Sequence, residues 1–236
     1  TDIDGEVTAG ETVTVAYEVS NTGGVQATQN ITVAVDNTTQ QTEENVTLAG
    51  GETFSGTFEY DTGVGDTPAV TVTVASADDT ATASVTVLEP AVFVVTITSI
   101  DEEVVAGDSL TVAYEVSNTG EATATQDIAF AVEGATEATE QGVTLNGSET
   151  FGGQFGYETA TGDTPAVNVT VSSADDAATG TVAVLTPPAF QVAITSINET
   201  VTPGETILAD YEVTNTGDVQ GTQDITLTVD GTSQTQ

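Results

Sequence analysis

The residues of this chain that could do chemistry are carboxylates and asparagines. Its 236 residues include 37 Asp and Glu but no Lys, Arg, His or Cys. A pair of carboxylates can hydrolyse a glycosidic bond, and the candidates are Asp78 with Asp79, a pair that recurs as Asp175 and Asp176, and the run from Asp101 to Glu103. Neighbouring residues of a strand point to opposite faces, and the repeated Asp-Asp pair is typical of a solvated turn. We therefore expect no enzyme.

Asparagine is the more informative residue type. Of nine asparagines, six begin an Asn-x-Ser/Thr acceptor sequence for N-linked glycans. If Ser and Thr were placed at random, six such matches would have a probability on the order of one in four thousand. We expect several of them to carry glycans, which would place the chain outside the cytoplasm. The six are Asn30, Asn37, Asn45, Asn146, Asn168 and Asn198.

The other three asparagines each begin an Asn-Thr-Gly triplet at the end of a nearly identical stretch. "VAYEVSNTG" occurs twice, from Val15 and from Val112, and "LADYEVTNTG" runs from Leu208. Asn and Gly tolerate positive φ, and the Asn side chain can bind turn amides. We interpret these triplets as structural turns. The residues concerned are Asn21, Gly23, Asn118, Gly120, Asn215 and Gly217.

These stretches belong to a repeat of 97 residues, since Tyr17, Tyr114 and Tyr211 are equally spaced. That length suits a small domain with its own core. The repeat predicts three units: residues 1–89, lacking their first strand; residues 90–186, complete; and residues 187–236, the first part of a third unit. The junctions "VLEPAVF" and "VLTPPAF" contain proline, which stiffens the chain and cannot donate to a sheet ladder.

Because the six acceptor asparagines differ between repeats, core packing does not explain them.

Each unit shows the period of two that is typical of β-strands. Apolar residues alternate with polar ones from Leu110 to Val116, and the same alternation recurs around Phe130, Phe155 and Val169. A short segment at Val143 and Leu145 completes about seven strands per unit. That number predicts an all-β fold of tandem immunoglobulin-like sandwiches.

The net charge of −37 indicates the setting. Charge of one sign repels itself and destabilises a compact chain in dilute buffer, but molar salt screens it within about 3 Å. The charge therefore favours a protein from a halophilic organism. Nucleic acid and anionic membranes are disfavoured as partners because the chain has no cationic side chain. Calcium binding at a junction between repeats stays open, with four acidic residues as candidate ligands. Potassium or sodium ions condensed on the acidic surface are the favoured alternative. The candidates are Glu89, Asp101, Glu102 and Glu103.

The motifs "GETVTVAYEVSNTG", from Gly10, and "LAGGETFSGTFEY", from Leu48, resemble the cell-adhesion-related domain CARDB of archaeal and bacterial surface proteins. The similarity covers both longer units and, in part, the third. One departure is "LNGSETF" from Leu145, in which a glycine is displaced. The resemblance implies an immunoglobulin-like fold, an extracellular structural or adhesive role and no catalysis.

Two functions remain open. In the first, the chain is a glycosylated stalk, surface-layer or fibre segment of a halophile, or of a virus that infects one, and its partners are envelope proteins. In the second, it is a subunit of a self-assembling filament whose copies pair, by strand complementation or along sheet edges. The longest apolar run, around Ala91 to Val95, is too short to insert into a membrane.

The charge leads to a test of stability. We expect the midpoint of thermal unfolding to be higher in about 2 M than in about 50 mM potassium chloride, because salt screens the repulsion between carboxylates. Circular dichroism at both concentrations measures the midpoint. Equal midpoints would contradict the halophilic interpretation.

Overall fold

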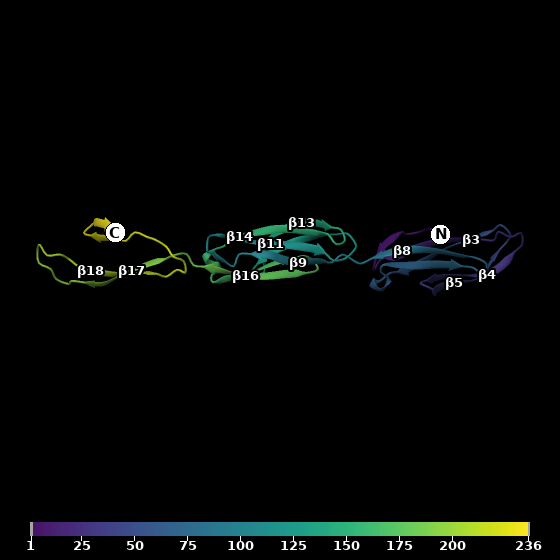
Figure 1. The fold of residues 1–236 in the computed structure, drawn as a ribbon, viewed down its shortest axis with the longest axis horizontal. Coiled ribbons are helices and arrows are strands. Elements are labelled where there is room, and N and C mark those ends of the chain that lie inside the picture. Colours follow the sequence, from purple (N-terminus) through teal and green to yellow (C-terminus); the bar gives the residue numbers. More distant parts are fainter. Residues whose placement is uncertain (1, 236) are drawn as a thin grey trace. The chain divides into compact units, whose positions relative to one another are not determined.

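The structure is a computed structural model that describes residues 2–235, with side chains for residues 3–233. Its elements are strands, apart from two single turns of 3-10 helix, η1 (Val64–Asp66) and η2 (Thr161–Asp163). The chain is therefore all-β, as the alternation of apolar and polar residues predicts. Figure 1 shows the ribbon coloured along the sequence, from purple at the N-terminal end to yellow at the C-terminal end. We call residues 1–89, 90–186 and 187–236 the first, second and third repeats.

The first repeat folds into two sheets. One has the order β1-β3-β6 and the other β2-β8-β7-β4-β5. Within them β2 runs parallel to β8, while β3 and β6 pair antiparallel over their full lengths. The strands are β1 (Asp2–Ile3), β2 (Glu6–Thr8), β3 (Thr12–Ser20), β4 (Ala27–Val35), β5 (Thr38–Leu48), β6 (Thr53–Asp61), β7 (Ala69–Ala75) and β8 (Thr80–Leu88).

The second repeat has the same topology, with sheets β14-β11-β9 and β10-β16-β15-β12-β13. In this repeat β9 is a long first strand, and β1 corresponds only to its last two residues. The strands are β9 (Phe93–Ile100), β10 (Glu103–Val105), β11 (Ser109–Asn118), β12 (Ala124–Val132), β13 (Ala135–Leu145), β14 (Thr150–Glu158), β15 (Ala166–Ser172) and β16 (Ala177–Leu185).

The third repeat forms two separate strand pairs. Its first strand pairs antiparallel with the strand that ends in the Asn-Thr-Gly triplet, and Phe190 lies opposite Asn215. Most apolar side chains of this pair are exposed, including Val192, Ile194 and Tyr211. The strands are β17 (Phe190–Ile197), β18 (Ala209–Asn215), β19 (Thr226–Val229) and β20 (Thr232–Thr235).

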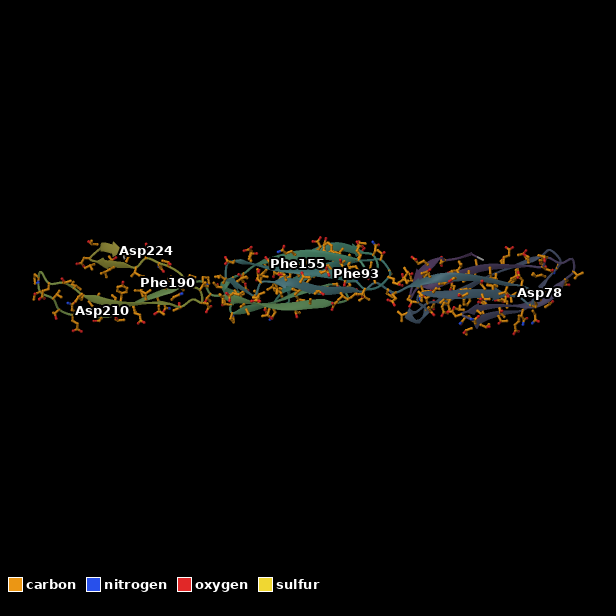
Figure 2. All side chains as sticks on the ribbon, viewed as in Figure 1. Asp78, Phe93, Phe155, Phe190, Asp210 and Asp224 are labelled. Carbon is orange, nitrogen blue, oxygen red and sulfur yellow. The ribbon has the colours of Figure 1, made fainter. Side chains whose placement is uncertain are left out.

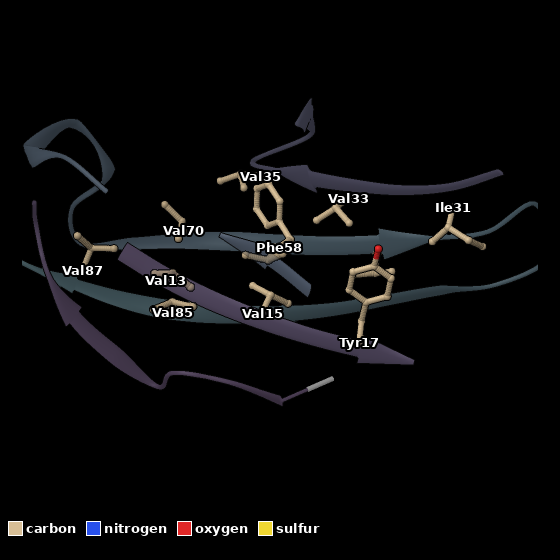
Figure 3. Close-up of a cluster of buried hydrophobic side chains, with 12 residues drawn as sticks. Val13, Val15, Tyr17, Ile31, Val33, Val35, Phe58, Val70, Val85 and Val87 are labelled. Carbon is tan, nitrogen blue, oxygen red and sulfur yellow. The ribbon is translucent and has the colours of Figure 1, made fainter. Parts of the chain in front are cut away.

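The core of the first repeat lies between its two sheets. Val13, Val15 and Tyr17 project from one face of β3, as Figure 3 shows. They meet valines and an isoleucine from β4, β7 and β8, and Phe58 from β6. Alternate residues of β3 are buried and exposed in turn, so the alternation read from the sequence is the alternation between core and solvent. This arrangement is an immunoglobulin-like β-sandwich.

Aromatic rings reinforce the core of the second repeat. Phe155 stacks on Tyr114 with ring centroids 4.9 Å apart and on Phe130 at 5.2 Å; Phe155 and Phe93 are labelled in Figure 2. Stacked rings add to the free energy gained by burying their area. Burial, more than the nearby carboxylate of Glu140, raises the pKa of Tyr114.

The strand count differs from the sequence-based expectation of about seven: each of the first two repeats has eight. The sequence analysis missed one strand and predicted another as too short. The short β10 was not predicted because three residues show no alternation. The predicted segment at Val143 and Leu145 is the end of β13, an 11-residue strand. Most of β13 is polar because it lies at a sheet edge, where polar residues discourage unwanted pairing.

The chain divides into two compact units. The first comprises Thr1–Val94, Ser117–Thr125 and Thr144–Thr150; the second comprises Val95–Val116, Gln126–Val143 and Phe151–Gln236. This division does not follow the 97-residue frame, and the domain borders drawn from the repeat stay a prediction. Among the described residues, no helix is long and apolar enough to cross a membrane.

We expect Phe130→Ala to lower the free energy of unfolding of the second repeat by about 3–5 kcal/mol, because it removes a buried ring from the aromatic stack. Denaturant titration in molar salt, followed by tyrosine fluorescence, measures the change. Thr139→Ala on the exposed face of β13 is the control and should change stability little. A loss below about 1 kcal/mol for Phe130→Ala would contradict the assigned core.

Candidate functional site

The six acceptor asparagines all have exposed side chains. They lie on all three repeats and on both strands and turns. Exposure is what attachment of a glycan to the side-chain amide requires, but it does not test attachment, so glycosylation stays a prediction. The structure does, however, give reasons why asparagine occupies most of these positions.

Two of the asparagines occupy left-handed backbone positions. Asp36 and Asn37 have φ of 46° and 65° and form the two-residue connection between β4 and β5. Asn45 has φ of 56°, next to a register shift between the same two strands. Glycine stands at the equivalent positions, Gly134 with φ of 82° and Gly142 with φ of 68°. Asn tolerates this conformation better than most residues, so backbone geometry explains both choices.

Two more asparagines use the side-chain oxygen as an acceptor where another repeat has aspartate. Asn30 Oδ1 accepts a hydrogen bond from the Asn45 amide at 2.9 Å, and Asp127 does the same for Gly142 at 2.8 Å. Asn198 Oδ1 accepts from the Leu208 amide at 2.8 Å. Asp101 occupies the position equivalent to that of Asn198. An oxygen is needed at these positions, and either residue supplies it.

Asn146 and Asn168 have no such reason for their identity. They stand where the first repeat has Ala49 and Thr71. The Asn146 side-chain nitrogen donates to Glu149 at 2.9 Å. The Asn168 Oδ1 accepts from the Thr181 hydroxyl at 2.9 Å. The first repeat folds with Ala49 and Thr71 at the equivalent positions, so the fold does not require asparagine at either site.

The asparagines of the Asn-Thr-Gly triplets have a different structural environment. The Asn118 side chain is 1% exposed. Its nitrogen donates to the carbonyl oxygens of Ala122, Asn146 and Leu145 at 2.8, 3.1 and 3.3 Å. Its oxygen accepts from the amides of Gly120 at 3.0 Å and Val92 at 3.2 Å. One carboxamide thus joins the turn, the following loop and the segment that enters β9.

The other two triplets repeat this arrangement in part. Asn21 donates to Val25 and Leu48 and accepts from Gly23. Asn215 accepts from Gly217 and from Ala189, both at 3.0 Å, and Ala189 is the equivalent of Val92. Glycine is required in the second and third triplets because a Cβ on Gly120 would lie 1.9 Å from the Pro90 oxygen, and one on Gly217 would lie 2.0 Å from the Pro187 oxygen.

In the second and third repeats, the residue after the triplet binds the junction that precedes the repeat. Glu121 accepts a hydrogen bond from the Glu89 amide at 3.2 Å, and its own amide donates to the Glu89 oxygen at 3.0 Å. Asp218 accepts from the Thr186 amide at 2.8 Å and from the Thr186 hydroxyl. Both hydrogen bonds lower the pKa of the Asp218 carboxyl, and the bond from the hydroxyl has the larger effect. Sequence reasoning missed this role, although acidic residues recur after Gly120 and Gly217.

The Asp-Asp pairs also have a role that was not expected. Ser76 and Asp79 close a turn between β7 and β8, as predicted for a solvated turn. In the second repeat, however, the carboxylate of Asp176 accepts a hydrogen bond from the Val95 amide at 2.9 Å. Asp176 therefore holds the first strand of its sandwich. The recurrence of the Asp-Asp pair after 97 residues is the sequence feature that could have indicated this role.

The carboxylates form no metal-binding cluster in the part of the chain that the structure describes. No group of three or more that could hold a metal occurs among those residues. Of the four residues considered for calcium, Asp101 uses its carboxylate to bind the Thr111 amide. Glu103 lies in β10, and the backbone oxygens of Glu89 and Glu102 accept from the amides of Ala122 and Ala183. Calcium binding stays a prediction without a defined site.

No known family model matches the chain, and no curated protein is similar to it. Solved structures are similar at low identity. The CARDB domain of PF1109 from Pyrococcus furiosus, solved in complex with di-metal ions, is 12% identical over 40% of this chain and 92% of that one, with a TM-score of 0.35. Fibronectin(III)-like modules of CbhA from Clostridium thermocellum are 12% identical over 77% and 88%, with a TM-score of 0.30. An ICAM-5 D1–D4 fragment is 11% identical over 100% and 72%, with a TM-score of 0.37.

We expect Asn118→Asp to lower the free energy of unfolding by about 1–3 kcal/mol, because a carboxylate cannot donate and would face three carbonyl oxygens. Asn37→Asp adds the same charge at an exposed turn and is the control. Urea unfolding in molar salt compares the two variants. Equal losses would show that charge, and not the buried hydrogen bonds, decides the effect.

Proposed function

We propose that this chain is a non-catalytic structural module displayed on the outside of a halophilic cell. The observation that carries the proposal is the placement of charge: every carboxylate whose side chain is described is exposed or half-buried. Figure 2 shows Asp78, Asp210 and Asp224 on the ribbon. An acidic coat that stays hydrated suits molar salt, where screening removes most of its self-repulsion.

The absence of catalysis is supported by what the carboxylates do. Many of them accept hydrogen bonds from backbone amides at turns, strand entries and junctions. An acid-base pair for glycoside hydrolysis needs two carboxyl groups that face one site. Asp78 and Asp176 instead bind a glutamine side chain and a strand amide, respectively. These contacts favour an architectural role for the acidic residues.

Glycans and other partners complete the proposal. Exposed acceptor asparagines lie on each repeat, so attached glycans would be distributed over all three repeats. Potassium or sodium would condense on the acidic surface, with at most weak calcium binding. Envelope proteins or further copies of the chain are the proposed partners, in a stalk, a surface layer or a fibre of cellular or viral origin. Nucleic acid and direct membrane insertion have no place in this function.

We expect glycopeptides from protein isolated from its native source to carry hexose-containing mass additions at several of the six acceptor asparagines. Asn146 and Asn168 are the strongest candidates, because the fold does not require asparagine at either position. Mass spectrometry of peptides from two proteases, before and after chemical deglycosylation, identifies the sites. Asn21, Asn118 and Asn215 lack the acceptor sequence and are internal controls. Six unmodified acceptors would refute the glycosylated surface module.

A further inference from the structure

Asn146 is the one asparagine of the chain that is followed by a glycine. The next residue matters because its backbone nitrogen lies within reach of the asparagine side chain, where attack on Cγ closes a five-membered ring. A side chain on that residue crowds the approach, and Gly147 has none. The other eight asparagines are followed by isoleucine, valine, threonine or glutamate. The pair Asn146-Gly147 is therefore the place in the chain where this attack is least hindered.

The connection between β13 and β14, residues 146–149, presents the two reacting groups. The side chain of Asn146 is exposed, and its Oδ1 accepts a hydrogen bond from the Thr123 hydroxyl at 3.0 Å. This bond draws electron density from Cγ and stabilises the negative charge that an attack would place on the oxygen. The amide nitrogen of Gly147 donates to no acceptor among residues 2–235, so the attack breaks no hydrogen bond at that nitrogen.

The nitrogen that would leave is held by one exposed contact. Asn146 Nδ2 donates to the Glu149 carboxylate at 2.9 Å. Water readily replaces a hydrogen bond of this kind, so its net contribution is small. The contact therefore does not hold the carboxamide against ring closure.

We propose that Asn146 is a site of spontaneous deamidation, with isoaspartate as one product. The Gly147 nitrogen loses its proton to solvent and attacks Cγ, so that a C–N bond forms. The bond between Cγ and Nδ2 breaks, and ammonia leaves with a proton taken from water. Water then adds to one of the two carbonyls of the resulting succinimide ring and opens it at the nitrogen. Opening at Cγ gives aspartate, and opening at the main-chain carbonyl gives isoaspartate.

Isoaspartate adds one carbon to the main chain at a point where the loop has no spare room. A Cβ on Gly147 would lie 2.5 Å from the Glu121 oxygen. The same loop holds the buried Asn118: the main-chain oxygen of Asn146 accepts from Asn118 Nδ2 at 3.1 Å, and the Ser148 amide donates to the Asn118 oxygen at 3.0 Å. A longer main chain cannot keep both contacts. Conversion therefore weakens the joint that Asn118 forms.

The first repeat keeps this turn but lacks the site. Ala49 and Gly50 stand at the equivalent positions. The Glu52 carboxylate accepts from the Ala49 amide at 2.7 Å, as Glu149 accepts from the Asn146 amide at 2.9 Å. The turn therefore does not require asparagine, and Asn146→Ala is a matched variant that removes the site.

Asn146 also begins the acceptor sequence Asn-Gly-Ser. A glycan would be attached to Nδ2, the nitrogen that must leave as ammonia, and would keep the residue as asparagine. Glycosylation and deamidation therefore exclude each other at this position. The protective role rests on the proposed glycosylation, whereas conversion of the bare chain does not.

The test uses the full chain expressed without glycans and stored in mildly alkaline buffer with molar salt. Pepsin replaces trypsin because the chain has no Lys or Arg, and its acidic digestion adds little further conversion. Mass spectrometry follows the gain of about 1 Da at each asparagine, and electron-transfer fragmentation separates isoaspartate from aspartate. We expect Asn146 to convert at least about tenfold faster than any other asparagine.

Two variants and a stability measurement complete the test. The urea midpoint of the parent chain should fall as isoaspartate accumulates, whereas that of Asn146→Ala should not change during the same storage. Ser148→Gly copies Gly51 of the first repeat, which like Ser148 has positive φ. This variant removes the acceptor sequence but keeps the Asn-Gly pair, and it should still convert.

Each result has a definite meaning. An Asn146 that stays intact while a synthetic peptide of residues 143–150 converts would overturn the proposal, because the fold would then protect the pair. Conversion of Asn37 or Asn168 as fast as that of Asn146 would also overturn it. An unchanged urea midpoint after conversion would overturn the coupling to Asn118.

Protein from the native source separates this proposal from the proposed glycosylation. Protection predicts asparagine in the intact Asn146 glycopeptides, and aspartate or isoaspartate in the bare peptides that contain position 146. A complete absence of glycans would refute the protective role but not the deamidation site, which the unglycosylated chain tests by itself.

Discussion

The structure depends on one electrostatic constraint: the chain has 37 carboxylates and no basic side chain. Buried charges are costly unless they are paired, and here no side chain can form an ion pair with a carboxylate. The carboxylates therefore stay at the surface, where they accept hydrogen bonds from the backbone. Glu11, Glu52, Asp66, Glu149 and Glu205 each bind the amide three residues earlier, at 2.7–2.9 Å. Acidic residues here act as turn caps.

Asparagine complements these caps because it can donate as well as accept. A carboxylate in the place of Asn118 would meet three carbonyl oxygens, so the neutral amide is the side chain that suits a buried joint. At exposed sites the choice is freer. Asn30 and Asp127 serve the same backbone amide contact, and Asn37 and Gly134 serve the same turn. The acceptor sequences therefore arise at positions that already favour asparagine, and Asn146 and Asn168 stand out from that background.

The first strand is the element that closes the sandwich of the second repeat. In the second repeat β9 completes a sheet and buries the residues at the end of β11. Pairing of a strand edge above an apolar floor is thus what closes the sandwich of the second repeat.

The sequence by itself determined the strand pattern, the 97-residue repeat and the surface charge, because alternation, spacing and composition are local properties. It also located both kinds of asparagine. Only the tertiary structure decided what those residues contact. Asp176 binds a strand 81 residues away, and Asn118 binds Val92 across a distance of 26 residues. Such contacts depend on which strands pair, and pairing over long separations leaves no local signal. The polar stretch of β13 became a strand for the same reason: its neighbour β12, and not its own alternation, holds it in the sheet.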